Sequence, residues 1–174
     1  VFAKEYYCQK KNDDTLFAFT RNMYDRLYEL ELLRQDWGNL LLESEVLLYA
    51  KGKEEYRRWQ QTFWKDATIK EENIISIEQL LVYFLFTYMP GAVYDGNLYS
   101  KVQMCVYLVW MIAELWLSRY IKNEGTLSME ERIDLVYRFS REVEHSDENI
   151  ELLEKLSRRE GVFGLDSLLT GILN

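Results

Sequence analysis

One long apolar segment, Leu98 to Ile121, constrains the fold of this chain more than any other feature. Its apolar residues recur at steps of three and four, the spacing of one helical face, and others such as Trp110 cover much of the opposite side. A helix that is apolar nearly all round is buried on most faces. Lys101 and Glu114 enclose only 12 uncharged residues, fewer than the roughly 18 that indicate a membrane span. We therefore predict a helix inside a soluble bundle, with burial against a partner chain as the remaining alternative.

A second apolar helix precedes this segment. Residues 77–89, IEQLLVYFLFTYM, are apolar almost throughout, and Pro90 should end or kink their helix because proline lacks a backbone donor. The turn-forming sequence DGN then leads into the next helix. Because short connections produce antiparallel neighbours, helices 77–89 and 98–121 should form a buried hairpin at the core.

Shorter helices should surround this hairpin. The capping-box pattern, in which a serine is followed three positions later by Gln or Glu, predicts helix starts at Ser76 and Ser128. Apolar residues from Leu16 to Trp37 follow one helical stripe, with a bend expected at Trp37–Gly38. The buried face of the helix after Ser128 should comprise Ile133, Val136, Tyr137 and Val143.

The chain shows no convincing strand pattern and no internal repeat. We predict an all-α fold, a single bundle of about six to seven helices over residues 1–174. Because the chain starts with Val1 rather than with methionine, we expect it to be a part of a longer protein or a processed one.

Charge and cysteine content exclude several classes of protein. The net charge of −8 argues against nucleic-acid binding and against docking on anionic lipid. Cys8 and Cys105 form neither a disulfide framework nor a CxxC motif, which indicates a reducing, cytoplasmic location.

Residues suited to catalysis are sparse. His145 is the only histidine, so neither a Ser–His–Asp triad nor a histidine-rich metal site is expected. The glycines form no GxGxxG or Walker loop, so a Rossmann-type nucleotide pocket is not encoded. The densest polar cluster runs from Arg141 to Asn149, and it is either a helix–helix corner in which Ser146 or Asp147 caps the next helix or a functional site. Arg141 and His145 share a helical face if the helix extends as far as His145.

The charged helix around Tyr56, Trp59 and Phe63 allows two interpretations. An aromatic face on such a helix usually packs into the core, but it could also bind a partner protein. The second interpretation makes the chain a non-enzymatic all-α interaction module, which requires these rings to be exposed.

Two motifs in residues 80–156 indicate a family. The link VYDGNLYSKV precedes the apolar helix, and SREVEHSDEN follows it ahead of a leucine-rich helix. In this order and separation they resemble the C-terminal half of the flagellin lysine-N-methylase family, a bacterial family; the first 75 residues match only loosely, through LYELELLRQDW.

The resemblance implies methyl transfer to lysine side chains of flagellin, with S-adenosylmethionine as the expected donor. It also implies an upstream cysteine-rich region of CxxCxxCC type that holds zinc or iron. Cys8 and Cys105 do not reproduce that region, so we expect no metal and no cofactor in this chain itself. In this reading the chain is a scaffold for the cysteine-rich domain or a holder of the protein substrate, and an oligomer remains open.

The expected working surface has two parts, the link before the central helix and the polar corner after it. Its candidate residues are Tyr94, Asp95, Lys101, Arg141, Glu142, Glu144, His145, Asp147 and Asn149.

Overall fold

The computed structural model describes residues 13–66 and 69–158, and within them every regular element is helical, as predicted. The α-helices are α2 (Asp13–Asp25), α3 (Gln35–Tyr49), α4 (Lys53–Lys65), α5 (Lys70–Tyr88), α6 (Ala92–Asp95), α7 (Leu98–Lys122), α8 (Met129–Val143) and α9 (Asp147–Ser157). Two short 3₁₀ helices, Arg26–Glu29 and Met89–Gly91, follow α2 and α5. Apart from the one-turn α6, this part of the chain therefore contains seven α-helices, which agrees with the expected number.

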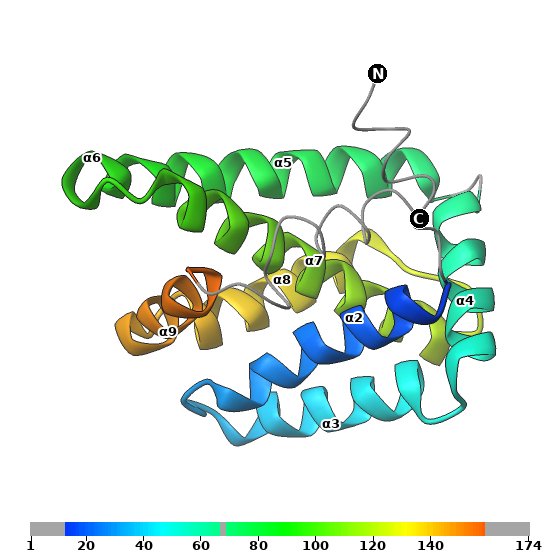
Figure 1. The fold of residues 1–174 in the computed structure, drawn as a ribbon. Coiled ribbons are helices and arrows are strands. Elements are labelled where there is room, and N and C mark those ends of the chain that lie inside the picture. The colour runs from blue at the N-terminus through cyan, green and yellow to red at the C-terminus, as the bar shows by residue number, and fades with distance from the viewer. Residues whose placement is uncertain (1–12, 67–68, 159–174) are drawn as a thin grey trace.

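Helix α7 is the centre of the bundle. It contacts α2, α3, α4, α5, α8 and α9, and Figure 1 shows it crossing the molecule between α5 and the lower helices. Its buried side chains include Tyr107, Ile112 and Trp116. The prediction of a buried central helix is confirmed, because side chains on nearly all its faces have helical neighbours.

Helix α5 runs antiparallel to α7 and has its most extensive contacts with it, as predicted (Figure 1). However, α5 begins at Lys70 rather than at residue 77, so Ser76 lies inside the helix and caps nothing. Only Asn73 and Phe84 are buried on α5. The prediction that both helices are buried is therefore correct for α7 and wrong for α5, which lies at the edge of the bundle.

The stripe from Leu16 to Trp37 does not form one helix. The chain leaves the helical conformation after Glu29, is extended at Leu30 and Arg34, and re-enters a helix at Gln35. The break lies before the predicted bend, and Trp37 occupies the first turn of α3. The physical reason is long-range, because the backbone of residues 31–34 is bonded by side chains from the far end of the chain.

The predicted turn between the hairpin helices is confirmed. Gly96 ends α6 with a φ of 69°, a left-handed conformation that glycine adopts without strain. The backbone N–H of Asn97 donates to the Asp95 carboxylate at 2.9 Å, which closes the turn before α7 begins.

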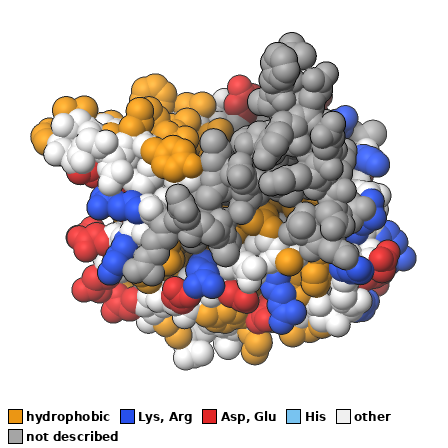
Figure 2. Space-filling view, viewed as in Figure 1, with side chains coloured by type: hydrophobic (Ala, Val, Ile, Leu, Met, Phe, Trp, Pro, Cys, Tyr) orange, Lys and Arg blue, Asp and Glu red, His pale blue; other side chains and the backbone are white. Residues whose placement is uncertain are grey.

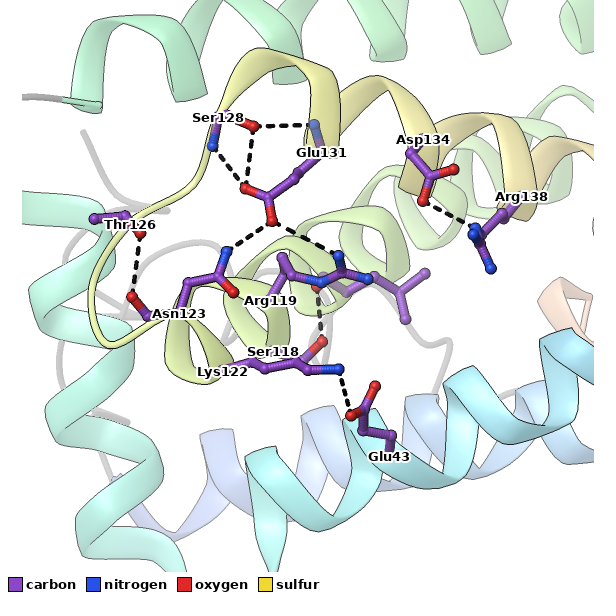
Figure 3. Close-up of polar contacts among 11 residues, drawn as sticks. Glu43, Ser118, Arg119, Lys122, Asn123, Thr126, Ser128, Glu131, Asp134 and Arg138 are labelled. Carbon is purple, nitrogen blue, oxygen red and sulfur yellow. Dashed lines mark hydrogen bonds and ion pairs between the residues drawn. The ribbon is translucent and has the colours of Figure 1, made fainter.

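The capping box at the start of α8 is present. The Glu131 N–H donates to Ser128 Oγ at 3.3 Å, and the Ser128 N–H donates to the Glu131 carboxylate at 3.0 Å. Figure 3 shows that this carboxylate also faces Asn123 and Arg119 at the end of α7. The N–H of Ser128 and the amide of Asn123 hold the pKa of Glu131 below its ordinary value. The box thus joins α8 to α7.

We expect Ser128→Ala to lower the free energy of unfolding by about 1 kcal/mol, because a helix-start donor loses its acceptor. Chemical denaturation followed by circular dichroism measures this. Ser128→Asp restores an acceptor and should recover most of the loss. If the alanine and aspartate variants were equally unstable, the cap would not be the cause.

The buried face of α8 agrees only in part with the predicted one, since Val143 is buried and Val136 packs against the core. Ile133 and Tyr137 are 61% and 56% exposed, whereas Arg132 and Glu142 are almost fully buried. The Arg132 guanidinium lies over the Trp116 ring and donates to the Asn73 side chain. The face is rotated because these two charged residues find buried partners.

Candidate functional site

The corner between α8 and α9 is built by a helix cap. Ser146 precedes α9, and its hydroxyl accepts from the Asn149 N–H at 3.2 Å. The carboxylates of Asp147 and Glu148 lie in the first turn, where their negative charge interacts favourably with the positive end of the helix dipole. This corner therefore forms for local reasons.

Two buried side chains of the corner, Asn149 and Glu142, bind the extended segment before α3. The Asn149 amide accepts from the Glu31 N–H at 2.7 Å and donates to the carbonyls of Glu31 and Glu142 at 3.2 and 2.9 Å. One Glu142 oxygen accepts from the N–H groups of Leu33 and Arg34 at 2.6 and 3.2 Å. These two candidates therefore hold the backbone of a segment more than one hundred residues away.

The other corner residues point in different directions. The Glu144 carboxylate accepts from the hydroxyl groups of Tyr83 and Tyr88 at 3.3 and 3.1 Å. His145 and Asp147 lie on the surface. The helix does not extend far enough for Arg141 and His145 to share a face, because α8 ends at Val143. Arg141 instead lies over the Tyr137 ring, at 5.2 Å from its centroid, and donates to the hydroxyl group of that tyrosine.

Of the link residues, Lys101 is part of the packed bundle and Tyr94 lies at the surface. Lys101 is buried, and its ammonium bonds Asp95 at 2.9 Å and Glu154 at 3.0 Å. Burial by itself would lower the pKa of Lys101, but the two carboxylates raise it above its ordinary value. Tyr94, by contrast, lies at the surface and is 92% exposed. Lys101 therefore fastens α9 to α7, and Tyr94 is available to a partner.

The structure brings both candidate surfaces to the same end of the bundle. Figure 1 places α6, the start of α7, and α9 together at that end. The hydrogen bond from Tyr88 to Glu144 joins the end of α5 to the corner, and the Lys101–Glu154 pair joins the link to α9. The two motifs noted in the sequence thus belong to one region.

A cavity of about 200 Å³ lies beside this region, between the start of α3 and α8. Its walls are Arg34, Asp36, Trp37, Asp134, Tyr137, Arg138, Arg141 and Glu142. Two arginines are paired: Arg34 with Asp36 at 3.3 Å, and Arg138 with Asp134 at 2.9 Å. The second oxygen of Glu142 is buried and has no hydrogen-bond partner among the described residues.

Only Arg141 and Glu142 of these eight residues were singled out from the sequence. Trp37 and Asp36 reach the cavity because the chain breaks before α3, a break that no local pattern indicated. A usable signal was present on α8, where Asp134, Arg138 and Arg141 recur at helical spacing. That spacing predicts a shared face but not what lies opposite.

A second buried carboxyl group was also missed. Glu114 on α7 is 4% exposed and accepts from the hydroxyl groups of Tyr49 and Tyr56 at 3.1 and 2.9 Å. Burial raises its pKa to about 7, although the two tyrosine hydrogen bonds act in the opposite direction. Its signal in the sequence was a lone acid inside an apolar helix. The cavity lining does not include Glu114, so we assign it to core structure.

A metal ion and S-adenosylmethionine, the groups that the sequence resemblance implies, each require a matching site. The described residues contain no cluster of three or more His, Cys, Asp or Glu side chains arranged to hold a metal ion. Burial raises the pKa of the Cys105 thiol to about 12, unsuited to a thiolate ligand. The cavity is smaller than the roughly 300–1,000 Å³ typical of cofactor pockets, so it does not fit a whole S-adenosylmethionine molecule.

Within residues 13–66 and 69–158, two stretches are long and apolar enough to span a membrane, Lys70–Asp95 and Leu98–Lys122. The second is largely buried inside the bundle, as the core helix of a globular protein is. The first is scarcely buried.

Comparison with known proteins agrees with the motifs. The FliB lysine N-methylase C-terminal domain family matches residues 2–171, which is almost the whole chain. Comparisons with curated proteins and with solved structures give no match. The all-α bundle and its two motif-bearing segments therefore belong to a protein of the FliB lysine N-methylase family, and the chain corresponds to the C-terminal domain of that family.

Proposed function

We propose that this domain holds the protein substrate of a lysine N-methylase and supports the part of the enzyme that transfers the methyl group. In this proposal the substrate is flagellin, the donor is S-adenosylmethionine, and the reaction takes place in the cytoplasm. The donor and the zinc- or iron-binding cysteine cluster belong to the cysteine-rich region. Family membership supports the reaction class, and the cavity beside α8 supports the holding role.

The single observation that carries the holding role is the uncommitted oxygen of Glu142. A buried carboxylate oxygen without a donor is costly, and an ammonium group satisfies it well. Trp37 and Tyr137 supply ring surfaces against which the methylene groups of a lysine side chain can pack. We infer that a substrate lysine enters this cavity with its ammonium toward Glu142.

The arginines of the cavity have a complementary role in this proposal. Among the described residues, Arg141 donates to the Tyr137 hydroxyl group, and it can also donate to a backbone carbonyl of the substrate. Asp36 and Asp134 keep the arginine pairs neutral, so the cavity does not repel an approaching lysine. Positioning, rather than a covalent step, is the contribution of these residues.

Glu142→Gln tests the role in the full-length enzyme. The glutamine oxygen still accepts from Leu33 and Arg34, but the charge and the free acceptor are removed. We expect the KM for flagellin to rise by roughly tenfold while kcat changes little, because one charge-assisted hydrogen bond to the substrate is lost.

Glu144→Gln is the matched control, since Glu144 lies two positions away and bonds tyrosines outside the cavity wall. Its KM should stay at the wild-type value. If Glu142→Gln left KM unchanged, or if both variants raised it equally, the cavity would not hold the substrate. If reversing the charges of the corner from Arg141 to Asn149 left methylation by the full-length enzyme unchanged, this would also count against a substrate-holding role.

The alternative of an interaction module based on α4 loses its main support. Tyr56 and Phe63 are buried within the chain, and Trp59 packs against the Tyr120 ring and donates to Glu55. These aromatic side chains fill the core between α4 and α7, so they do not form a free docking face.

A further inference from the structure

Helix α5 carries an apolar stripe that no described element covers. Ile75, Val82 and Phe86 are 51%, 43% and 79% exposed, and their spacing of seven and four residues places them on one helical face. Figure 2 shows apolar side chains gathered where α5 and α6 lie. The stripe continues onto α6 through Val93 and Tyr94, which are 84% and 92% exposed. Exposed apolar stripes of this kind mark interaction surfaces.

The exposed charges beside the α5 part of the stripe are acidic, whereas Asp95 beside the α6 part is paired with Lys101 and Arg158. Residues 71–100 contain four acidic residues and no lysine, arginine or histidine. Glu71 and Glu78 are exposed on one side of the stripe, and Glu72 lies on the other. Glu72 is 3.5 Å from the Arg132 guanidinium, whereas Glu71 and Glu78 face solvent. A partner that complements this surface must therefore be apolar along the stripe and basic where it lies beside Glu71 and Glu78.

This charge pattern selects among occupants. A second copy would place acidic edges against acidic edges, which repel at close distance. A membrane-surface helix would need basic residues at the edges to attract anionic lipid. A helical segment with an apolar stripe and flanking lysines meets both requirements of the surface, burying the stripe and pairing the glutamates.

We propose that the stripe Ile75–Val82–Phe86, with Val93 and Tyr94, docks an amphipathic helix of the protein substrate whose edges carry lysine or arginine. This inference rests on the proposed function, because a lysine N-methylase must engage a lysine-bearing polypeptide. It separates two tasks, since the α5 surface binds a helix of the substrate and the cavity at α8 receives one side chain. Docking away from the cavity raises the local concentration of substrate lysines.

The experiment measures binding of a fluorescent synthetic peptide to this chain by anisotropy. The probe is an amphipathic helix with a leucine stripe flanked by lysines, and the comparison peptide has glutamates at the flanking positions. We expect the lysine-flanked peptide to bind at least ~10-fold more tightly, with an advantage that shrinks as salt is added.

The double variant Val82→Ser/Phe86→Ser should weaken binding of the lysine-flanked peptide by at least ~10-fold, since the centre of the stripe is lost. Leu42→Ser/Val46→Ser is the matched control, because these α3 residues are also apolar, four apart, and 59% and 55% exposed. All four side chains lie at the surface, so both variants should keep the wild-type circular dichroism spectrum.

Equal binding of the two peptides, or an equal loss in both double variants, would overturn the proposal. So would a wild-type dimer in sedimentation that Val82→Ser/Phe86→Ser converts to a monomer, because a second copy would then cover the stripe. The assay uses no methyl transfer, so its outcome is independent of the Glu142→Gln result. A failure of either one can therefore be assigned to its own surface.

Discussion

Replacing Asn149 by alanine is expected to lower the free energy of unfolding by about 2–4 kcal/mol. The side-chain amide bonds the N–H and carbonyl groups of Glu31 and the carbonyl of Glu142, and it is 1% exposed. Alanine leaves these backbone groups without partners in a region that water enters poorly. Urea denaturation followed by circular dichroism measures the change.

Two variants on α9 separate this cause from others. Asn149→Asp keeps an acceptor for the Glu31 N–H but loses the two donated hydrogen bonds, so it should be unstable as well. Glu151→Ala alters an exposed side chain farther along α9 and should change stability by less than about 0.5 kcal/mol. A loss below about 1 kcal/mol for Asn149→Ala would mean that the extended segment is held by other contacts.

The buried Glu114 carboxyl should make stability depend on pH in an unusual direction. Its pKa rises from 4.5 to about 7 on folding, so the folded state binds more protons than the unfolded state between these values. Stability is then greatest below about pH 4.5 and falls as the pH rises to about 7, because the charged form is disfavoured in the core. The contribution lost over this range is about 3 kcal/mol.

Glu114→Gln isolates this contribution, because the glutamine side chain does not titrate. We expect the variant and the wild type to have similar unfolding free energies near pH 4, and the variant to be more stable by about 3 kcal/mol near pH 8. Other groups titrate equally in both proteins and cancel in the difference. A difference that stays constant with pH would mean that Glu114 ionises in the core without cost.

Local patterns in the sequence were sufficient for the central helix and its connections. The all-round apolar character of residues 98–121 predicted α7 at the centre. The capping box at Ser128 predicted the start of α8, and the choice between Ser146 and Asp147 placed the start of α9 within one residue. These features depend on residues within one or two turns of each other, since helix formation and capping are local. The FliB family motifs lie on this same predictable part of the chain.

Long-range contacts decided the remaining features. The apolar stripe through Leu30 predicted a continuous helix, but Glu142 and Asn149 supply hydrogen bonds that make an extended segment more stable there. The same two side chains bring α3 against α8 and so create the cavity, whose walls come from segments about one hundred residues apart.

The two apolar helices show the same division. Helices α5 and α7 are both largely apolar in sequence. However, α7 lies among six other helices, whereas α5 packs along one side only. Periodicity reports which side chains are apolar, whereas the number of neighbours determines which of them are buried. Residue pattern alone thus specified the helices, the caps and the family, and tertiary packing determined which apolar face stayed exposed and where the buried carboxylates found partners.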